Sequence, residues 1–156
     1  MLVKEVKAQE LTKNSFKTYG QVIELPQRDP IVSLPTHSYW HSIGDIGSLG
    51  DEGVVGYLIT KHRDFTFTQM ERHTRSIEAF IPLEGCSIFP VAPPSDLNDP
   101  NAMPSPEDVT AFILDGKKGV ILDEGTWHWA PFPLGIESTF ALLLKKPTVE
   151  KDITIK

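Results

Sequence analysis

Short runs of β-branched and aromatic residues, separated by turn residues, follow one another along most of the chain. Such runs are typical of β-strands, in which successive side chains face opposite sides of a sheet. The pattern predicts strands at residues 21–25, 38–43, 54–60, 65–73, 77–83, 87–92, 109–114, 119–122, 126–132 and 138–144. Many short strands with few helices are typical of an all-β sandwich or barrel.

Only one segment has the pattern of a helix start. Thr12 can cap a short helix over residues 13–18, and Gly20 is suited to end it. The expected fold is therefore all-β with a short N-terminal helix.

A proline-rich stretch at residues 90–108 divides the strands into two blocks. It contains six of the 13 prolines, so it cannot continue a sheet. It is too short to link two separate hydrophobic cores, and we interpret it as a long loop. Since 156 residues is also a usual length for one domain, we expect residues 1–156 to form a single domain.

Composition narrows the possible partners. The net charge of −6 disfavours nucleic acid, whose binding requires clustered Lys and Arg. No apolar run approaches the roughly 20 residues that span a bilayer, and charges interrupt the first residues, where a secretory signal would be apolar. The single cysteine, Cys86, excludes an internal disulfide. We expect a cytoplasmic protein that binds a small molecule, and neither nucleic acid nor a membrane.

An acid and an imidazole enter the predicted interior together. In the expected strand 65–73 the odd-numbered residues share one face, so Glu71 and His73 lie on the face that Phe65 and Phe67 mark as interior. A buried carboxylate is costly unless it is paired or binds a cation. This placement therefore calls for a metal ion or for compensating hydrogen bonds.

The spacing after these residues resembles the first cupin motif, His-x-His-x3–4-Glu-x6-Gly. Here it reads Glu71-x-His73-x4-Glu78-x6-Gly85, with Glu71 in the place of the first histidine. In cupins, which are jelly-roll barrels also called double-stranded β-helices, the motif side chains converge on one divalent metal. The resemblance implies a metal site inside such a barrel.

A second stretch resembles the second cupin motif, Pro-x-Gly-x2-His. It reads Asp123-x-Gly125-x2-His128, with Asp123 where proline is usual. The implied metal ligands are Glu71, His73, Glu78 and His128. Two imidazoles and two carboxylates suit Ni²⁺, Mn²⁺, Zn²⁺ or Fe²⁺. Taken singly, each of the four residues is more often solvated or space-filling, so the hypothesis rests on their shared spacing.

Three further residues are candidates for substrate binding. Tyr39 and His41 share one face of the expected strand 38–43, and a strand at the barrel mouth or a subunit contact would explain them equally. Arg63 could hold a carboxylate with two hydrogen bonds. Arg72, by strand parity, points away from the pocket.

Several fragments together resemble the ureidoglycolate lyase family of the cupin superfamily. The most specific is Glu-Arg-His at 71–73 followed by Ala-Phe-Ile-Pro at 79–82. Trp-His at 127–128 before Pro131 and Tyr-Gly-Gln-Val-Ile-Glu at 19–24 are also similar to the family. There are departures: the family often has Trp-His-His-Pro where this chain has Trp129 and Ala130, and not all members keep a carboxylate at position 78.

The resemblance implies a homodimeric cupin that cleaves ureidoglycolate, a small carboxylate, to glyoxylate and urea with a divalent metal, in allantoin and purine breakdown. Glu71 and His73 are the implied catalytic residues. One group must remove the substrate hydroxyl proton and then protonate the leaving nitrogen, with Glu71 or a metal-held water as the candidates. The alternatives are another metal-dependent cupin enzyme, such as an isomerase, lyase or dioxygenase, and a non-catalytic ligand-binding cupin.

Overall fold

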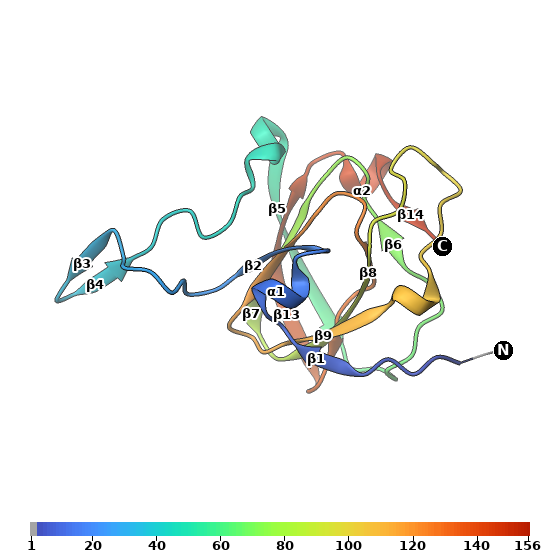
Figure 1. Cartoon of the computed structure of the whole chain (residues 1–156), viewed down its shortest axis with the longest axis horizontal. Helices are drawn as coiled ribbons and strands as arrows, with labels where there is room; N and C mark the ends of the chain where they lie inside the picture. Colours follow the sequence, from blue (N-terminus) through green and yellow to red (C-terminus); the bar gives the residue numbers. More distant parts are fainter. Residues whose placement is uncertain (1–2) are drawn as a thin grey trace.

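Two β-sheets face each other in the computed structural model, which describes residues 3–156 (Figure 1). Sheet A has the order β1 (Ala8–Glu10), β9 (Thr110–Leu114), β8 (Ser87–Ala92), β11 (Trp127–His128), β6 (Glu71–Arg72) and β14 (Thr154–Ile155), with β12 (Phe132–Pro133) beside β8. Sheet B has the order β2 (Gly20–Ile23), β10 (Gly119–Leu122), β7 (Glu78–Glu84), β13 (Glu137–Lys145) and β5 (Gly53–Lys61). Every strand pair except β1 with β9 is antiparallel.

The main hydrophobic core lies between the two sheets. In β7, Phe80 faces this core, whereas Ala79 and Ile81 belong to a second cluster on the outer face of sheet B. The main core includes Phe89, Val91, Phe112 and Leu114 from sheet A and Val22, Phe80, Val120, Leu122 and Phe140 from sheet B. Two such sheets around this core form a jelly roll, so the prediction of an all-β cupin barrel is confirmed.

The helices are all short. They are α1 (Lys13–Phe16), α2 (Thr148–Lys151) and the 3-10 helices η1 (Gly47–Glu52) and η2 (Pro106–Asp108). Within residues 3–156, none has the length and apolar character needed to cross a membrane.

Thr12 caps α1 as predicted. Its hydroxyl accepts a hydrogen bond from the Ser15 amide at 3.0 Å, and the Ser15 hydroxyl accepts one from the Thr12 amide at 3.1 Å. The predicted helix end was wrong, because α1 stops at Phe16 and Gly20 begins β2. Position 20 has no room for a larger side chain, because a Cβ atom there would lie 1.9 Å from the carbonyl oxygen of Ile121.

The predicted strand 65–73 was largely wrong, because only Glu71–Arg72 are in a strand. The amide of Thr66 bonds to the carbonyl of Asp64, so a local turn replaces a strand pairing there. Phe65 is 53% exposed, and Phe67 packs with the cluster of Met70 and Trp127 rather than in the main core. The predicted strand 126–132 is likewise interrupted between β11 and β12.

Residues 24–46 form an arm that stands away from the barrel (Figure 1). Its tip is a hairpin of β3 (Val32–Leu34) and β4 (His37–Tyr39). The predicted strand 38–43 was therefore misplaced, because pairing ends at Tyr39. The base of the arm is tied to β2, where the Gln21 side chain bonds to the backbone of Asp45 in both directions.

Most of the proline-rich stretch is a loop as predicted, and it covers the outer face of sheet A beside β6. The prediction was wrong for residues 90–92, which end β8, and Pro90 lies opposite Ala111 in the sheet. Arg72, which is buried, donates hydrogen bonds from its guanidinium to the backbone carbonyls of Asp96 at 3.0 Å and Asp99 at 2.8 Å. The same guanidinium lies 4.8 Å from the centre of the Trp127 ring. Arg72 thus points away from the barrel interior, in agreement with its strand parity.

Candidate functional site

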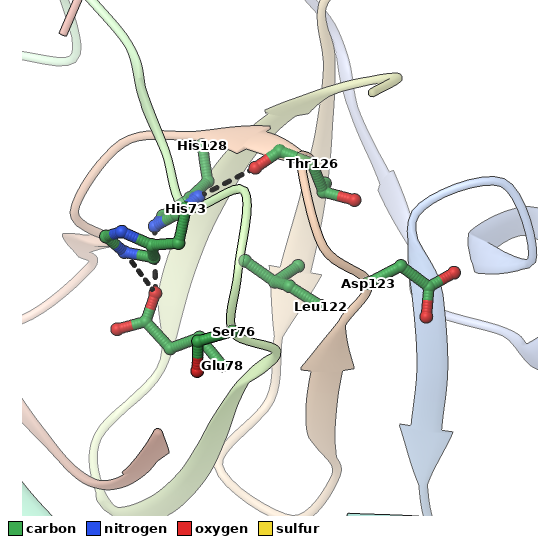
Figure 2. Close-up of a pocket in the computed structure, with 7 residues that line it drawn as sticks. All are labelled: His73, Ser76, Glu78, Leu122, Asp123, Thr126 and His128. Carbon is green, nitrogen blue, oxygen red and sulfur yellow. Dashed lines mark hydrogen bonds and ion pairs between the residues drawn. The ribbon is translucent and has the colours of Figure 1, made fainter. Parts of the chain in front are cut away.

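Three short stretches of chain bring the four predicted ligands together. Glu71 lies on β6, with His73 just beyond its end, and His128 lies on β11, directly opposite Glu71 in the pairing of the two strands. Glu78 begins β7 and so enters from sheet B. Figure 2 shows Glu78 reaching toward the imidazoles of His73 and His128 between the sheets.

The carboxylate of Glu78 lies between the two imidazoles. Its Oε2 atom is 3.1 Å from Nε2 of His73 and 3.0 Å from Nε2 of His128. Oε1 of Glu71 is 3.6 Å from Nε2 of His128. One potential ligand atom each from Glu71, His73 and His128 also lies within 4.8 Å of the others. The structure therefore gathers the predicted set, and the role of these residues as ligands stays a prediction.

The two carboxylates differ in their access to solvent. The side chain of Glu78 is 8% exposed, whereas that of Glu71 is 26% exposed. Phe80 and Phe89 pack against His128, with ring centroids 6.0 and 6.2 Å away. Glu78 thus belongs to an apolar inner half of the site, and Glu71 to its rim.

Backbone carbonyls fix the orientation of both imidazoles. Nδ1 of His73 bonds to the carbonyl of Asp152 at 2.8 Å, and Nδ1 of His128 bonds to that of Thr126 at 3.0 Å. Because a carbonyl only accepts, each Nδ1 carries the hydrogen. In the neutral rings the lone pair is then on Nε2, which faces Glu78. This is the arrangement usual for histidine ligands of metals.

The electrostatics of the metal-free cluster favour an ion pair. Burial opposes charge on His73, but the Glu78 carboxylate, the Asp152 carbonyl and the charge of Glu71 together raise the pKa of His73 to about 9. Burial opposes charge on Glu78 too, but the imidazoles of His128 and His73 lower the pKa of Glu78 to about 2. A buried carboxylate is thus kept ionised by the cationic imidazole beside it.

Unpaired atoms in the cluster fit a bound cation. Oε2 of Glu78 and Nε2 of His128 are buried and lie 3.0 Å apart, but among residues 3–156 neither atom makes a hydrogen bond of normal geometry, so their contact is one of charge alone. Buried polar atoms in native proteins are nearly always paired, and a cation between these atoms would satisfy both. Two imidazole nitrogens with carboxylate oxygens are a suitable donor set for Zn²⁺, Ni²⁺, Mn²⁺ or Fe²⁺. The residues therefore fit a divalent metal ion.

Sequence reasoning missed the residues that hold the ligands in place. Asp152 lies 79 positions from His73, and no motif links the two. Asp123, which stands in for the motif proline, lies on the far side of Leu122 from the imidazoles in Figure 2.

The structure does not bring the three predicted substrate-binding residues to the cluster. Tyr39 and His41 lie on the arm, where the Tyr39 hydroxyl is hydrogen-bonded to Nδ1 of His41 at 2.9 Å. Arg63 donates to the carbonyls of Ala130 at 2.7 Å and Pro131 at 3.1 Å, and its guanidinium lies 3.8 Å from the centre of the Phe132 ring. Their role in substrate binding stays a prediction.

Comparisons with known proteins identify the family. RmlC from Streptococcus suis in complex with dTDP-D-xylose is a structural match that covers 65% of this chain and 47% of the RmlC chain, at 9% sequence identity and a TM-score of 0.44. Ureidoglycolate lyase of Azotobacter vinelandii is 29% identical over 124 residues, covering 76% of this chain and 71% of its own. Ureidoglycolate lyase of Burkholderia mallei (strain NCTC 10229) is 29% identical over 147 residues, which cover 90% of this chain and 82% of the relative. The model of the ureidoglycolate lyase family matches residues 3–154, so this chain belongs to the ureidoglycolate lyase family.

Proposed function

We propose that this protein cleaves ureidoglycolate to glyoxylate and urea with the help of a divalent metal ion, as a step of allantoin and purine breakdown in the cytoplasm. The family match supports the substrate. The observation that carries the site is the buried Glu78 carboxylate between two imidazoles whose Nε2 atoms face it.

His73, His128 and Glu78 would hold the metal, and Glu71 lies at the more exposed rim of the site. A bound divalent ion acts as a Lewis acid and lowers the pKa of a hydroxyl group that it contacts. His73 serves as a ligand and not as an acid or base, because its Nδ1 is bonded to the Asp152 carbonyl and its Nε2 faces Glu78.

Glu71 is the proposed proton carrier. From the rim, its carboxylate takes the proton of the substrate hydroxyl, and the O–H electrons form the carbonyl of glyoxylate. The C–N bond breaks with its electrons on nitrogen, and Glu71 returns the same proton to that nitrogen to give urea. No water is consumed, and the aromatic rings behind His128 help to keep water out.

An assay of purified protein on racemic ureidoglycolate, with metal content measured on the same sample, tests this function. We expect equal amounts of urea and glyoxylate from the Ni²⁺- or Mn²⁺-loaded protein. The His128→Ala variant should lose this activity, and Glu84→Gln, which removes an exposed carboxylate at the other end of β7, should keep it.

Two other outcomes would each contradict the proposal. Tightly bound metal without product would favour another metal-dependent cupin enzyme. A wild-type protein that binds no metal, together with folded Glu71→Ala and His128→Ala variants, would favour a non-catalytic ligand-binding cupin.

We also propose a homodimer that forms through sheet B. β5 is the edge strand of this sheet, and its outward side chains Val55, Tyr57 and Ile59 are 72%, 68% and 51% exposed. The neighbouring outward positions on β13 are also uncharged, although Glu84 of β7 lies opposite the first of them. They are Thr139, Ala141 and Leu143 on β13, with Ile81 and Ala79 beside the last two. A long exposed apolar edge of this kind is usually covered by a partner.

The arm supports a second copy as that partner. A hairpin of two three-residue strands is not stable alone in water, and its apolar residues Ile31 and Leu34 are exposed. A second copy would cover both the arm and the sheet by two-fold symmetry. We expect wild-type protein to sediment as a dimer and Tyr57→Glu as a monomer. Met103→Glu, an equally drastic change at an exposed apolar residue of the proline-rich loop, should remain dimeric, and a monomeric wild type would refute the proposal.

A further inference from the structure

The C-terminal segment lies against the strand that carries Glu71. β14 pairs with β6, with Ile155 opposite Glu71 and Thr154 opposite Arg72. Met70 and Lys156 extend this pairing by two backbone hydrogen bonds of 2.8 and 2.9 Å. β6 lies between β11 and β14 in sheet A, so β14 is one of the two neighbours that hold the strand of Glu71 in place.

Asp152 joins this segment to the loop that follows His73. Its carboxylate accepts hydrogen bonds from the amide of Thr74 at 2.9 Å, the hydroxyl of Thr74 at 3.1 Å and the amide of Arg75 at 2.8 Å. Asp152 itself is buried. Hydrogen bonds to a buried carboxylate are stronger than those between neutral groups, so this contact fixes the backbone on both sides of it.

The same residue orients His73 through its backbone carbonyl, which accepts the Nδ1 hydrogen at 2.8 Å. The other imidazole is held differently, because His128 bonds to Thr126, two residues away on its own stretch of chain. Of the two imidazoles in the site, His73 is therefore the one whose Nε2 lone pair is directed by a distant segment.

We propose that residues 152–156 act as a latch that completes the metal site, with Asp152 as its positioning residue. When the latch is docked, Nε2 of His73 faces the centre of the site; when it is released, the ring loses its orienting partner. Metal binding and latch docking are then coupled, and by linkage each strengthens the other. This inference rests on the proposed metal site but not on the proposed reaction.

Ni²⁺ titration by calorimetry tests the first half of this coupling. Asp152→Ala removes the carboxylate that docks the latch, and we expect it to weaken Ni²⁺ binding about 10- to 100-fold, the usual effect of losing a partner that orients a ligand. Asp152→Asn keeps one oxygen for Thr74 but loses an acceptor for Arg75. Its Ni²⁺ affinity should therefore lie between those of wild type and Asp152→Ala. Glu150→Ala removes an exposed carboxylate of α2, just before the latch, and should bind Ni²⁺ like wild type.

Amide hydrogen exchange on wild-type protein tests the second half without any substitution. We expect Ni²⁺ to slow exchange at the amides of Met70 and Lys156, the pair that closes the latch. Unchanged exchange at these amides, or equal Ni²⁺ affinity in wild type and both Asp152 variants, would overturn the latch. If Asp152→Ala does not fold, Asp152→Asn and the exchange data still decide. No substrate is present in these experiments, so their failure is separate from a failure of the lyase assay.

Discussion

Glu78 and Glu71 approach the same imidazole from opposite sheets, but their surroundings differ. Glu78 is buried and lies within 3.1 Å of both imidazoles. Glu71 is partly exposed and lies 3.6 Å from one of them. Two carboxylates from one motif thus differ in depth. The inner one is suited to hold a cation, and the outer one is suited to meet a substrate and exchange a proton.

The largest expected effect, on both metal affinity and activity, comes from a substitution in the buried inner half of the site. Glu78→Ala removes the carboxylate between the two imidazoles and leaves them without a shared counter-charge. We expect metal affinity to fall by more than about 100-fold, since even a partner outside the ligand set can account for 10- to 100-fold, and activity to fall to background. Metal content after dialysis, measured beside turnover, checks this. Full metal content in Glu78→Ala would show that Glu78 is not a ligand.

A change at the rim should separate activity from metal binding. Glu71→Gln keeps the shape of the side chain but cannot carry a proton, so we expect kcat to fall about 10²- to 10⁴-fold. Metal affinity should fall far less than in Glu78→Ala. Steady-state kinetics and metal titration on one preparation measure both quantities. Full turnover with full metal occupancy would remove Glu71 from the mechanism, and equal loss of both would make it a ligand like Glu78.

The smallest expected effect is on the pH dependence of stability without metal. The folded-state pKa of His73 is raised to about 9 from 6.5, so its stabilisation is fully present below pH 6.5 and is lost as pH rises through 9. The folded-state pKa of Glu78 is lowered to about 2 from 4.5, so its stabilisation is present above pH 4.5 and is lost as pH falls through 2. Metal-free protein should therefore be most stable between about pH 4.5 and 6.5.

Thermal unfolding with and without EDTA measures this profile. Because metal binding requires a deprotonated His73, the gain in Tm from metal should grow between pH 5 and pH 9. Glu78→Gln should reduce the alkaline decline of the metal-free protein, because Glu78 is the main group that raises the pKa of His73. A flat profile from pH 6.5 to 9 in metal-free wild type would contradict the ion pair between His73 and Glu78.

Sequence predicted the cupin barrel and the four residues that meet in it, because motif spacing on paired strands fixes which side chains share the interior. One step of that reasoning was nevertheless wrong. Phe65 and Phe67 do not mark the interior, since the chain before Met70 is irregular. Glu71 and His73 still face the site because strand alternation holds locally around β6.

The missed features depend on contacts between distant segments. Asp152 reaches His73 only through the docking of β14, and no local pattern marks that contact. The arm was missed because β3 and β4 are only three residues long, which is too short to give an alternating pattern.

The buried Arg72 has a consequence for how the neighbouring loop can vary. Its guanidinium holds the loop through the backbone carbonyls of Asp96 and Asp99, which every type of amino acid provides. The carboxylates of Asp96 and Asp99 matter as well, because they accept hydrogen bonds from the amides of Asn98 and Asn101 and so shape the turns that present these carbonyls. Elsewhere in the proline-rich loop, beside the proposed metal ligands, new sequences could be introduced by protein engineering while Asp96, Asp99 and the anchor on β6 are kept.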